Sequence, residues 1–272
     1  MTTDTSPTSE GADTPPPRRR RVMRRVRVTR VEQLSPRMVR VTFTGDDLGA
    51  FAWNGPAAHI KLIFPEEGQV EPPMPQPDGP RSTRMRTYTP RRFDPAVTEL
   101  DVEFVLHGDG PASSWAAQAK VGQALIVAGP GPSYQIDPDA DWFLLVGDDA
   151  ALPAIETILD ALPAEARVRV LLEIVDEHEE RPLSTAAQLD ITWLHRGAHP
   201  AQVDTALEEA VRMTQLPVGN GRIGCEAAAM RRIRRHLLHE RGHDPATIVT
   251  RGYWKLGAVD YTDHDYGAES DS

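Results

Sequence analysis

The hydrophobic pattern of this chain changes character near residues 133–141. Before that point, strand-sized apolar runs with partial two-residue alternation lie between clusters of glycine and proline, which is typical of an antiparallel barrel or sandwich. After it, similar runs alternate with helix-length segments, which indicates a parallel sheet with helices on its faces. The sequence therefore predicts an α+β protein of two domains: an N-terminal antiparallel β-barrel and a C-terminal α/β domain with a mostly parallel sheet.

The same pattern divides the chain into four segments. Residues 1–21 are rich in threonine, serine, proline and arginine, and we expect a disordered arm because so few apolar groups cannot repay the entropy of ordering. Residues 22–136 form the predicted barrel, residues 137–260 the α/β domain, and residues 261–272 an acidic tail. The predicted barrel strands cover residues 22–31, 38–43, 59–64, 85–88, 99–106 and 124–128. In the second domain we predict strands at 142–146, 167–175, 191–195, 221–224 and 248–253, and helices at 150–161, 200–213 and 227–241.

Charge and composition exclude several functional classes. The 272 residues include 30 lysines and arginines against 40 aspartates and glutamates, so the chain is not built to coat nucleic acid or an anionic membrane. It has no apolar run of the roughly 20 residues that a membrane helix needs. With no apolar core typical of a signal peptide near the N-terminus and only one cysteine, we expect a cytoplasmic protein without disulfides. The arginine-rich stretch 18–30 is either a solubilising arm or a contact for an anionic partner.

The first candidate site is the run Arg86-Thr87-Tyr88-Thr89-Pro90-Arg91. A guanidinium can bind a phosphate with two hydrogen bonds, an aromatic ring can pack against a flat heterocycle, and a hydroxyl can bind its polar edge. The run is equally compatible with an ordinary barrel strand that carries a solvent-facing arginine. A second candidate further along the chain supports the interpretation of this run as a binding site.

That second candidate runs from His107 to Ala116 and combines a glycine-rich loop with the expected start of a helix at 115–119. Free backbone N–H groups and the helix dipole favour an anion at such a point, which would suit a pyrophosphate. The alternative is a simple serine cap. Together, the two candidates could face one dinucleotide.

Two further segments lie where a predicted parallel strand runs into a helix. In the first, Gly147, Asp148 and Asp149 precede a helix, at the sheet edge where α/β proteins bind ligands. These aspartates would repel a phosphate, so we expect them to cap the helix or to reach a ribose hydroxyl. In the second, Cys225 and Glu226 stand before a helix, and we interpret Cys225 as a small buried residue because no neighbouring histidine could act as its base.

Histidines recur at helical spacing in His236, His239 and His243, and His195 and His199 are four residues apart. Such groups can bind a transition metal. Cations are also favoured near a helix C-terminus, however, and we predict no metal site.

Taken together, these motifs resemble the siderophore-interacting proteins, a family of flavin-dependent ferric-siderophore reductases in the ferredoxin-reductase-like superfamily. The resemblance covers about residues 22–259 and also includes Glu226-Ala227 with Met230-Arg231 and the run 252–257. It implies a barrel that binds FAD and an α/β domain that binds NADH or NADPH. The FAD contacts that it implies are Arg86, Thr87, Tyr88, Thr89, His107, Gly110, Ala112, Ser113, Ser114 and Trp115. The nicotinamide site that it implies is bordered by Gly147, Asp149, Ala151, Leu152, Pro153, Trp193, Arg196 and Glu226, and the siderophore contacts are Lys255, Trp254 and Arg251.

The activity implied by the resemblance is reduction of a ferric siderophore by NAD(P)H through FAD, which releases Fe(II) for assimilation. The flavin would carry the chemistry, so no catalytic side chain is predicted. Two alternatives remain: a general NAD(P)H:flavin oxidoreductase with another acceptor, and a siderophore-binding protein without redox activity. We expect a monomer. The sequence departs from the family at residues 129–132, where Gly-Pro-Gly-Pro replaces a Gly-Pro-Arg-Gly motif and removes one expected phosphate contact.

Overall fold

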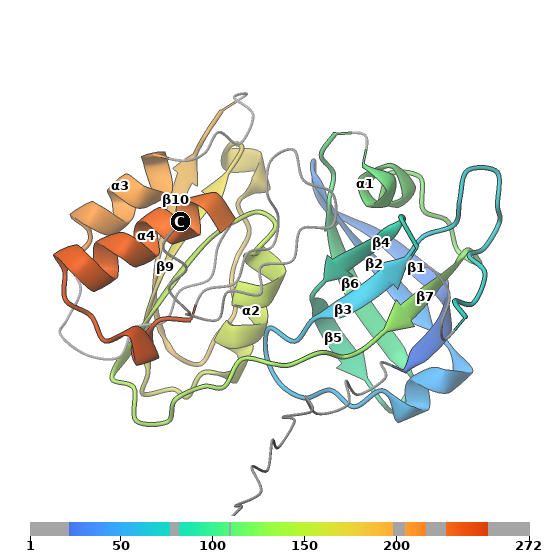
Figure 1. Ribbon diagram of the computed structural model, residues 1–272, viewed down its shortest axis with the longest axis horizontal. Helices are drawn as coiled ribbons and strands as arrows, with labels where there is room; N and C mark the ends of the chain where they lie inside the picture. Colours follow the sequence, from blue (N-terminus) through green and yellow to red (C-terminus); the bar gives the residue numbers. More distant parts are fainter. Residues whose placement is uncertain (1–21, 77–81, 109, 198–204, 216–226, 250–272) are drawn as a thin grey trace, which may run out of the picture.

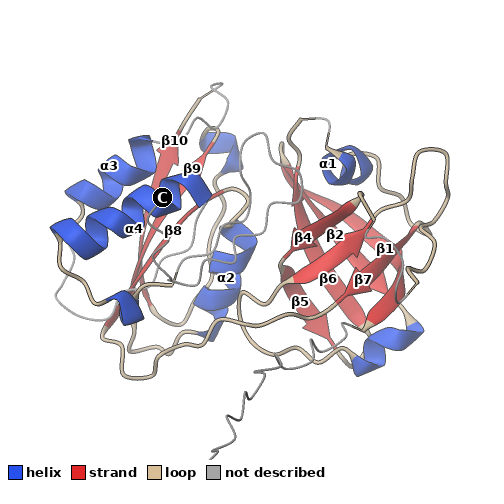
Figure 2. Cartoon of the chain, viewed as in Figure 1, coloured by secondary structure: helices blue, strands red, loops and turns tan. Residues whose placement is uncertain are grey.

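The computed structural model describes residues 22–76, 82–108, 110–197, 205–215 and 227–249 (Figure 1). The predicted arm at 1–21, the tail at 261–272 and the predicted strand at 221–224 lie outside these ranges. The described chain forms two sheets, one on each side of the molecule, and helix α2 (Leu152–Ala161) lies between them (Figure 2). No helix in the described ranges has the length and apolar character that crossing a membrane would require.

The first sheet has seven antiparallel strands in the order β4-β3-β7-β1-β2-β6-β5. The strands are β1 (Met23–Ser35), β2 (Met38–Thr44), β3 (Ile60–Ile63), β4 (Met85–Tyr88), β5 (Pro90–Asp94), β6 (Glu99–Val105) and β7 (Ala124–Ala128). A 3-10 turn, η1 (Asp46–Ala50), follows β2, and helix α1 (Pro111–Ala116) follows β6. The edge strands β4 and β5 are joined by Thr89 alone, so the sheet must curl far enough to bring the ends of these two strands together. This confirms the predicted antiparallel barrel.

Alternation along β2 explains why the sheet curls around one core. Val39, Val41 and Phe43 are buried in the barrel interior, opposite Phe104, Val102 and Leu100 of β6. The residues between them are polar and bond across the same strand pair. Arg40 lies 2.7 Å from Glu103, and the Thr42 hydroxyl donates to Asp101 at 2.6 Å. A period of two places one side chain in the core and the next on the outer face.

The second sheet is parallel, with the order β10-β9-β8 among the described residues. Its strands are β8 (Trp142–Asp148), β9 (Arg167–Ile174) and β10 (Gln188–His195). Helix α2 packs on one face, and α3 (Thr205–Met213) and α4 (Ala227–Arg235) cover the other (Figure 1). A π-helical turn (His236–Glu240) extends α4, and 3-10 turns lie at Glu177–Glu179 and Pro245–Thr247. The predicted parallel α/β arrangement is confirmed.

Three sequence-based expectations differ from the structure. Strand β5 was not predicted, because its proline disfavours strand pairing except at a sheet edge, where β5 lies. Helix α1 begins at Pro111, four residues before the predicted start, because proline is well suited to the first turn of a helix. Ile248 and Val249 are not in a strand, and the rest of the predicted strand 248–253 lies outside the described residues.

Candidate functional site

The segment from Arg86 to Thr89 crosses from one barrel edge to the other. The ring of Tyr88 is half-buried and packs at 4.6 Å, centroid to centroid, against Phe104, and burial raises the pKa of its hydroxyl. Thr89 is buried. The Oγ1 atom of Thr87 is also buried and has no hydrogen-bond partner among the described residues. An unpaired buried hydroxyl costs free energy. Thr87 Oγ1 is therefore a candidate hydrogen-bond partner for a polar ligand atom.

Arg86 does not extend freely from this segment. Its Nη1 atom donates to the carbonyl oxygens of Thr83 at 2.9 Å and of Met85 at 2.8 Å. A phosphate contact from Arg86 would therefore replace these two bonds to neutral carbonyl oxygens with bonds to an anion, in which both donor and acceptor are charged.

Helix α1 closes one end of the barrel. Ala112 and Trp115 are buried in the barrel core, and the buried Ser113 hydroxyl accepts the backbone N–H of His107 at 2.9 Å. The His107 and Ser114 side chains are exposed. Gly110 precedes the helix without a side-chain cap, and a Cβ atom on Gly110 would meet nothing within 4 Å. The first N–H groups of a helix lack partners within it, so the space beside Gly110 gives them access to an outside acceptor.

The carboxyl edge of the parallel sheet holds the second group of predicted residues. Asp148, buried at the end of β8, accepts the backbone N–H groups of Ala150 at 2.9 Å and Ala151 at 3.0 Å. Asp149 instead accepts a hydrogen bond from Arg196 at 2.5 Å. Burial disfavours the charged form of Arg196 and so lowers its pKa. The nearby carboxylates of Asp149 and Glu173 favour the charged form more strongly, and the pKa of Arg196 is raised. Asp148 therefore caps the turn into α2, whereas Asp149 holds an arginine at the sheet edge.

Other residues predicted for this edge occupy different surroundings. Ala151, Leu152 and Pro153 are buried, the first two in the core beneath α2. Trp193 is partly buried against the same core from β10. Glu226, Arg251, Trp254 and Lys255, like Cys225, lie outside the described residues.

An ion network joins the two sheets, and sequence reasoning missed it. Arg91 of β5 lies 3.2 Å from Glu156 and 2.6 Å from Asp160 on α2. Arg181, which precedes β10, donates to Glu103 of β6 at 2.5 Å and also contacts Glu156. Burial raises the pKa of Glu156, although both arginines oppose this shift. The only sequence signal for the network was Arg91, at the end of the first motif.

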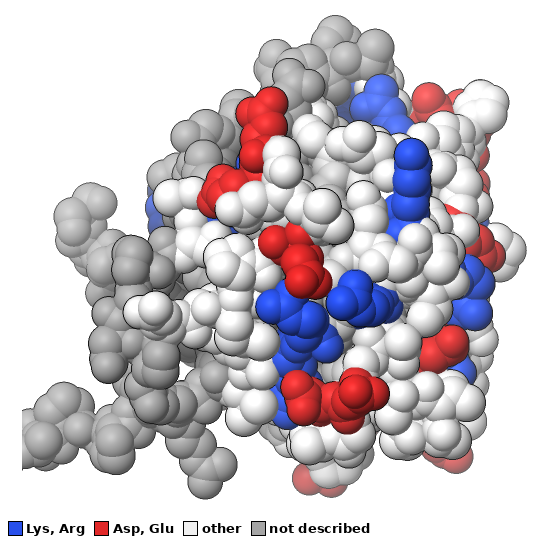
Figure 3. Space-filling model, turned by 90° about the vertical axis from the view of Figure 1, so that its right-hand side faces the viewer, with Lys and Arg blue, Asp and Glu red and all other residues white. Residues whose placement is uncertain are grey.

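Charges on the outer face shown in Figure 3 are interspersed rather than gathered by sign. The arginines of the run 18–30 that the structure describes form hydrogen bonds or ion pairs with other residues of the barrel domain. Arg24 donates to main-chain carbonyls, including that of Gly129 at 2.7 Å. Arg25 lies 2.9 Å and Arg27 3.5 Å from Glu71, and Arg30 lies 3.8 Å from Asp101. This part of the run is therefore accounted for by structural contacts.

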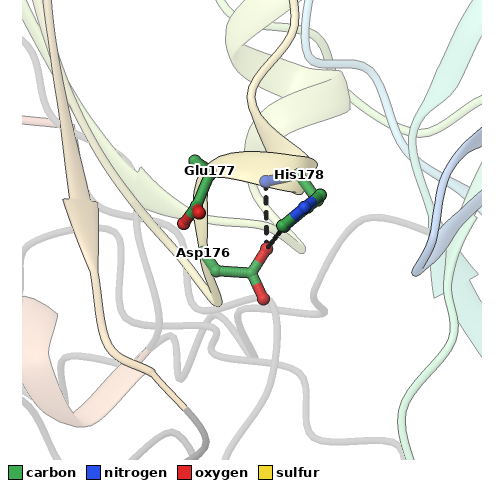
Figure 4. Close-up of side chains that lie close together, drawn as sticks. All are labelled: Asp176, Glu177 and His178. Carbon is green, nitrogen blue, oxygen red and sulfur yellow. Dashed lines mark hydrogen bonds and ion pairs between the residues drawn. The ribbon is translucent and has the colours of Figure 1, made fainter.

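One group of possible metal ligands occurs in the described residues: Asp176, Glu177 and His178 (Figure 4). Asp176 accepts the backbone N–H of His178 at 3.0 Å, which caps the short turn and lowers the pKa of the Asp176 carboxyl. This cap accounts for the geometry. In the predicted histidine set, His236 bonds Glu240 at 2.8 Å and Arg241 at 3.1 Å through its two ring nitrogens. We assign a metal to neither group.

Comparison with known proteins gives a consistent result for both halves of the chain. Residues 27–134 match the siderophore-interacting FAD-binding domain, and residues 140–257 match the siderophore-interacting protein family. The ferric vibriobactin reductase ViuB of Vibrio cholerae serotype O1 is 33% identical over 250 residues, which are 87% of this chain and 90% of that protein. The NADPH-dependent ferric-chelate reductase of Escherichia coli K12 is 31% identical over 243 residues, or 85% of this chain and 92% of that protein.

A solved structure supports the same relationship. The siderophore utilization protein from T. fusca superposes with a TM-score of 0.79 at 36% identity and covers 90% of this chain and 96% of its own. Sequence and structure agree over nearly the whole chain, which confirms the resemblance found from the motifs. The chain belongs to the siderophore-interacting protein family.

Proposed function

We propose that this protein reduces ferric siderophores with electrons from NADH or NADPH, passed through FAD. The observation that carries the proposal is family membership over both domains, together with two relatives at 33% and 31% identity that are named as ferric reductases. These relatives align along 87% and 85% of this chain, so their similarity is not confined to one cofactor-binding half.

Features of the barrel fit an FAD molecule. The half-buried ring of Tyr88 offers a surface for a flat tricyclic ring, and the buried Thr87 hydroxyl lacks a partner among the described residues. The uncapped start of α1 beside Gly110 suits a pyrophosphate. In this proposal Arg86, Thr87, Tyr88 and Thr89 hold the flavin and a phosphate. The rest of FAD is bound by His107, Gly110, Ser113 and Ser114, while Ala112 and Trp115 act from the barrel core by holding α1 in place.

Bound FAD would supply the exchange between the two-electron chemistry of a dihydronicotinamide and the one-electron reduction of Fe(III). The protein's own task is to bind and align. The proposed nicotinamide site has Gly147, Asp149 and Arg196 at the carboxyl edge of the sheet, with Ala151, Leu152, Pro153, Trp193 and Glu226. Because Asp149 holds Arg196 at 2.5 Å, the guanidinium is fixed before any ligand arrives. Ala151 and Leu152 act from the core, by setting the path of the backbone.

The siderophore contacts that we propose are Lys255, Trp254 and Arg251. A chain with a net charge of -10 repels an anionic iron complex unless cations stand where it docks. Reduction then releases the metal, because the hard oxygen donors of siderophores favour Fe(III) over the softer Fe(II). A single cysteine suits the reducing cytoplasm, where we propose that the protein acts as a monomer.

The test begins with the visible spectrum of the purified protein. We expect a flavin spectrum that bleaches when NADH or NADPH is added without oxygen and returns when a ferric catecholate or hydroxamate siderophore follows. A colourless protein that takes up no FAD would favour a binding protein without redox activity. Reoxidation by quinones or free flavin, but by neither siderophore, would favour a general flavin reductase.

Lys255→Ala separates substrate binding from flavin binding. This variant should keep its FAD and its reduction by the dinucleotide, and it should turn over the ferric siderophore more slowly, because an anionic ligand loses a cation. Steady-state kinetics on one siderophore, with FAD measured per chain, check this. Kinetics identical to the wild type would reject the role of Lys255.

A further inference from the structure

Arg91 lies on barrel strand β5, next to the segment of the proposed flavin site. It follows Thr89 by two residues, and the ladder between β5 and β6 skips it: Pro90 pairs with Val102, and Arg92 pairs with Asp101. This irregularity is a β-bulge, which redirects a side chain out of the regular alternation. The Arg91 side chain reaches across the domain boundary to α2.

Its two partners lie on one face of α2. Arg91 Nε is 3.2 Å from Glu156 Oε2, and Nη1 is 2.6 Å from Asp160 Oδ2. Residues four apart share a helix face, so one guanidinium engages both carboxylates. Only 18% of the Arg91 side chain and 9% of Glu156 are exposed, which limits screening by solvent. Since the first residues of α2, Leu152 and Pro153, belong to the proposed nicotinamide site, this contact connects both sites over a few residues on either side.

Arg181 makes a second connection in the opposite direction. It comes from the α/β domain and reaches Glu103 on the barrel, whose side chain has 0% exposure. It also contacts Glu156, so the two connections share a carboxylate. A nearby hydrogen bond from the Ala57 backbone N–H to the Thr157 hydroxyl, 2.8 Å long, adds a third attachment. Several separate attachments restrict rotation of one domain on the other as well as separation.

We propose that Arg91, supported by Arg181, is a positioning residue that sets the orientation of the nicotinamide-binding domain on the flavin-binding barrel. This inference rests on the proposed function. In the step concerned, a hydride carrying two electrons leaves C4 of the dihydronicotinamide and joins the flavin, so the nicotinamide is oxidised and the flavin is reduced. The reacting atoms must approach to about 3–3.5 Å, and a displacement of about 1 Å can cost on the order of 100-fold in rate.

The first test measures flavin reduction in Arg91→Met, which keeps the length and apolar stem of the side chain but removes its charge. The matched control is Arg92→Met on the same strand, because Arg92 pairs only with residues of the barrel domain in the described structure, Asp94 at 2.6 Å and Asp101 at 3.6 Å. Stopped-flow mixing without oxygen gives the reduction rate at saturating dinucleotide, per bound FAD. We expect a fall of about 10- to 100-fold in Arg91→Met, partial rescue in Arg91→Lys, and a near wild-type rate in the control.

The second test does not depend on activity. Spin labels at Ala96→Cys on the barrel and Glu165→Cys after α2, both exposed positions, report the distance between domains in a Cys225→Ser background. The distance distribution should broaden in Arg91→Met and stay unchanged in Arg92→Met. A merely stabilising role would lower the unfolding temperature without changing this distribution or the saturated rate per bound FAD.

The outcomes separate the two proposals. Slower reduction together with a broadened distance distribution supports the positioning role. A wild-type rate, or a wild-type distance distribution, in Arg91→Met overturns it. A wild-type protein that binds no FAD, or that neither dinucleotide reduces, instead overturns the proposed function, and the spin-label distances then still test whether Arg91 orients the domains.

Discussion

Trp115 anchors helix α1 to the barrel, and its removal should loosen both the fold and the proposed FAD site. The indole is 6% exposed, and its ring centroid lies 5.5 Å from that of Phe64, 5.8 Å from Phe104 and 6.2 Å from Phe43. Truncation of a buried tryptophan to alanine costs about 3–5 kcal/mol. The buried indole nitrogen has no hydrogen-bond partner among the described residues, so its removal reduces this cost by about 1 kcal/mol. Trp115→Ala should therefore destabilise the protein by about 2–4 kcal/mol.

Thermal unfolding followed by circular dichroism measures this effect. At about 2–4 °C per kcal/mol for a protein of this size, the midpoint should fall by roughly 4–16 °C. FAD per chain should fall too, because Gly110 and the first turn of α1 would no longer be held in place. Trp53→Ala is the matched control, since that side chain is 37% exposed, and it should lose less. A shift in Trp115→Ala no larger than that in Trp53→Ala would refute the packing argument.

Two further predictions concern other parts of the fold. In Gly45→Ala the new Cβ would lie 2.5 Å from the carbonyl oxygen of Arg25. Since backbone cannot easily move aside, we expect the free energy of unfolding in denaturant to fall by about 1–3 kcal/mol. Gly49→Ala, whose Cβ meets open space, should be near neutral, and equal losses in the two variants would contradict this. A hydrogen bond from Arg212 lowers the pKa of Glu240 from 4.5 to about 2, so its contribution to stability is present above about pH 4.5 and is lost as the pH falls toward 2. The unfolding midpoint of Glu240→Gln should thus lie below that of the wild type near neutral pH and approach it in acid, whereas a constant difference would exclude this linkage.

The fold class could be read from the sequence because the signals are local. Alternation in strands such as β2 and the strand-to-helix order after residue 141 depend only on neighbours in the chain. The same holds for motifs that combine glycine with a helix start, and these indicated the family. Strand β5 and the start of α1 were not predicted, because proline at residues 90 and 111 indicates a strand break or a loop until its place in the fold is known.

Side-chain roles within the candidate site were decided by tertiary structure. Asp148 and Asp149 are adjacent and chemically identical, yet one caps a turn while the other holds Arg196, 47 residues away. Arg91 and Glu156 are 65 residues apart, and Arg181 and Glu103 are 78 apart. Periodicity carries no information about such pairs, because they form only when the barrel and the parallel sheet pack together and exclude water from charges that would otherwise remain hydrated.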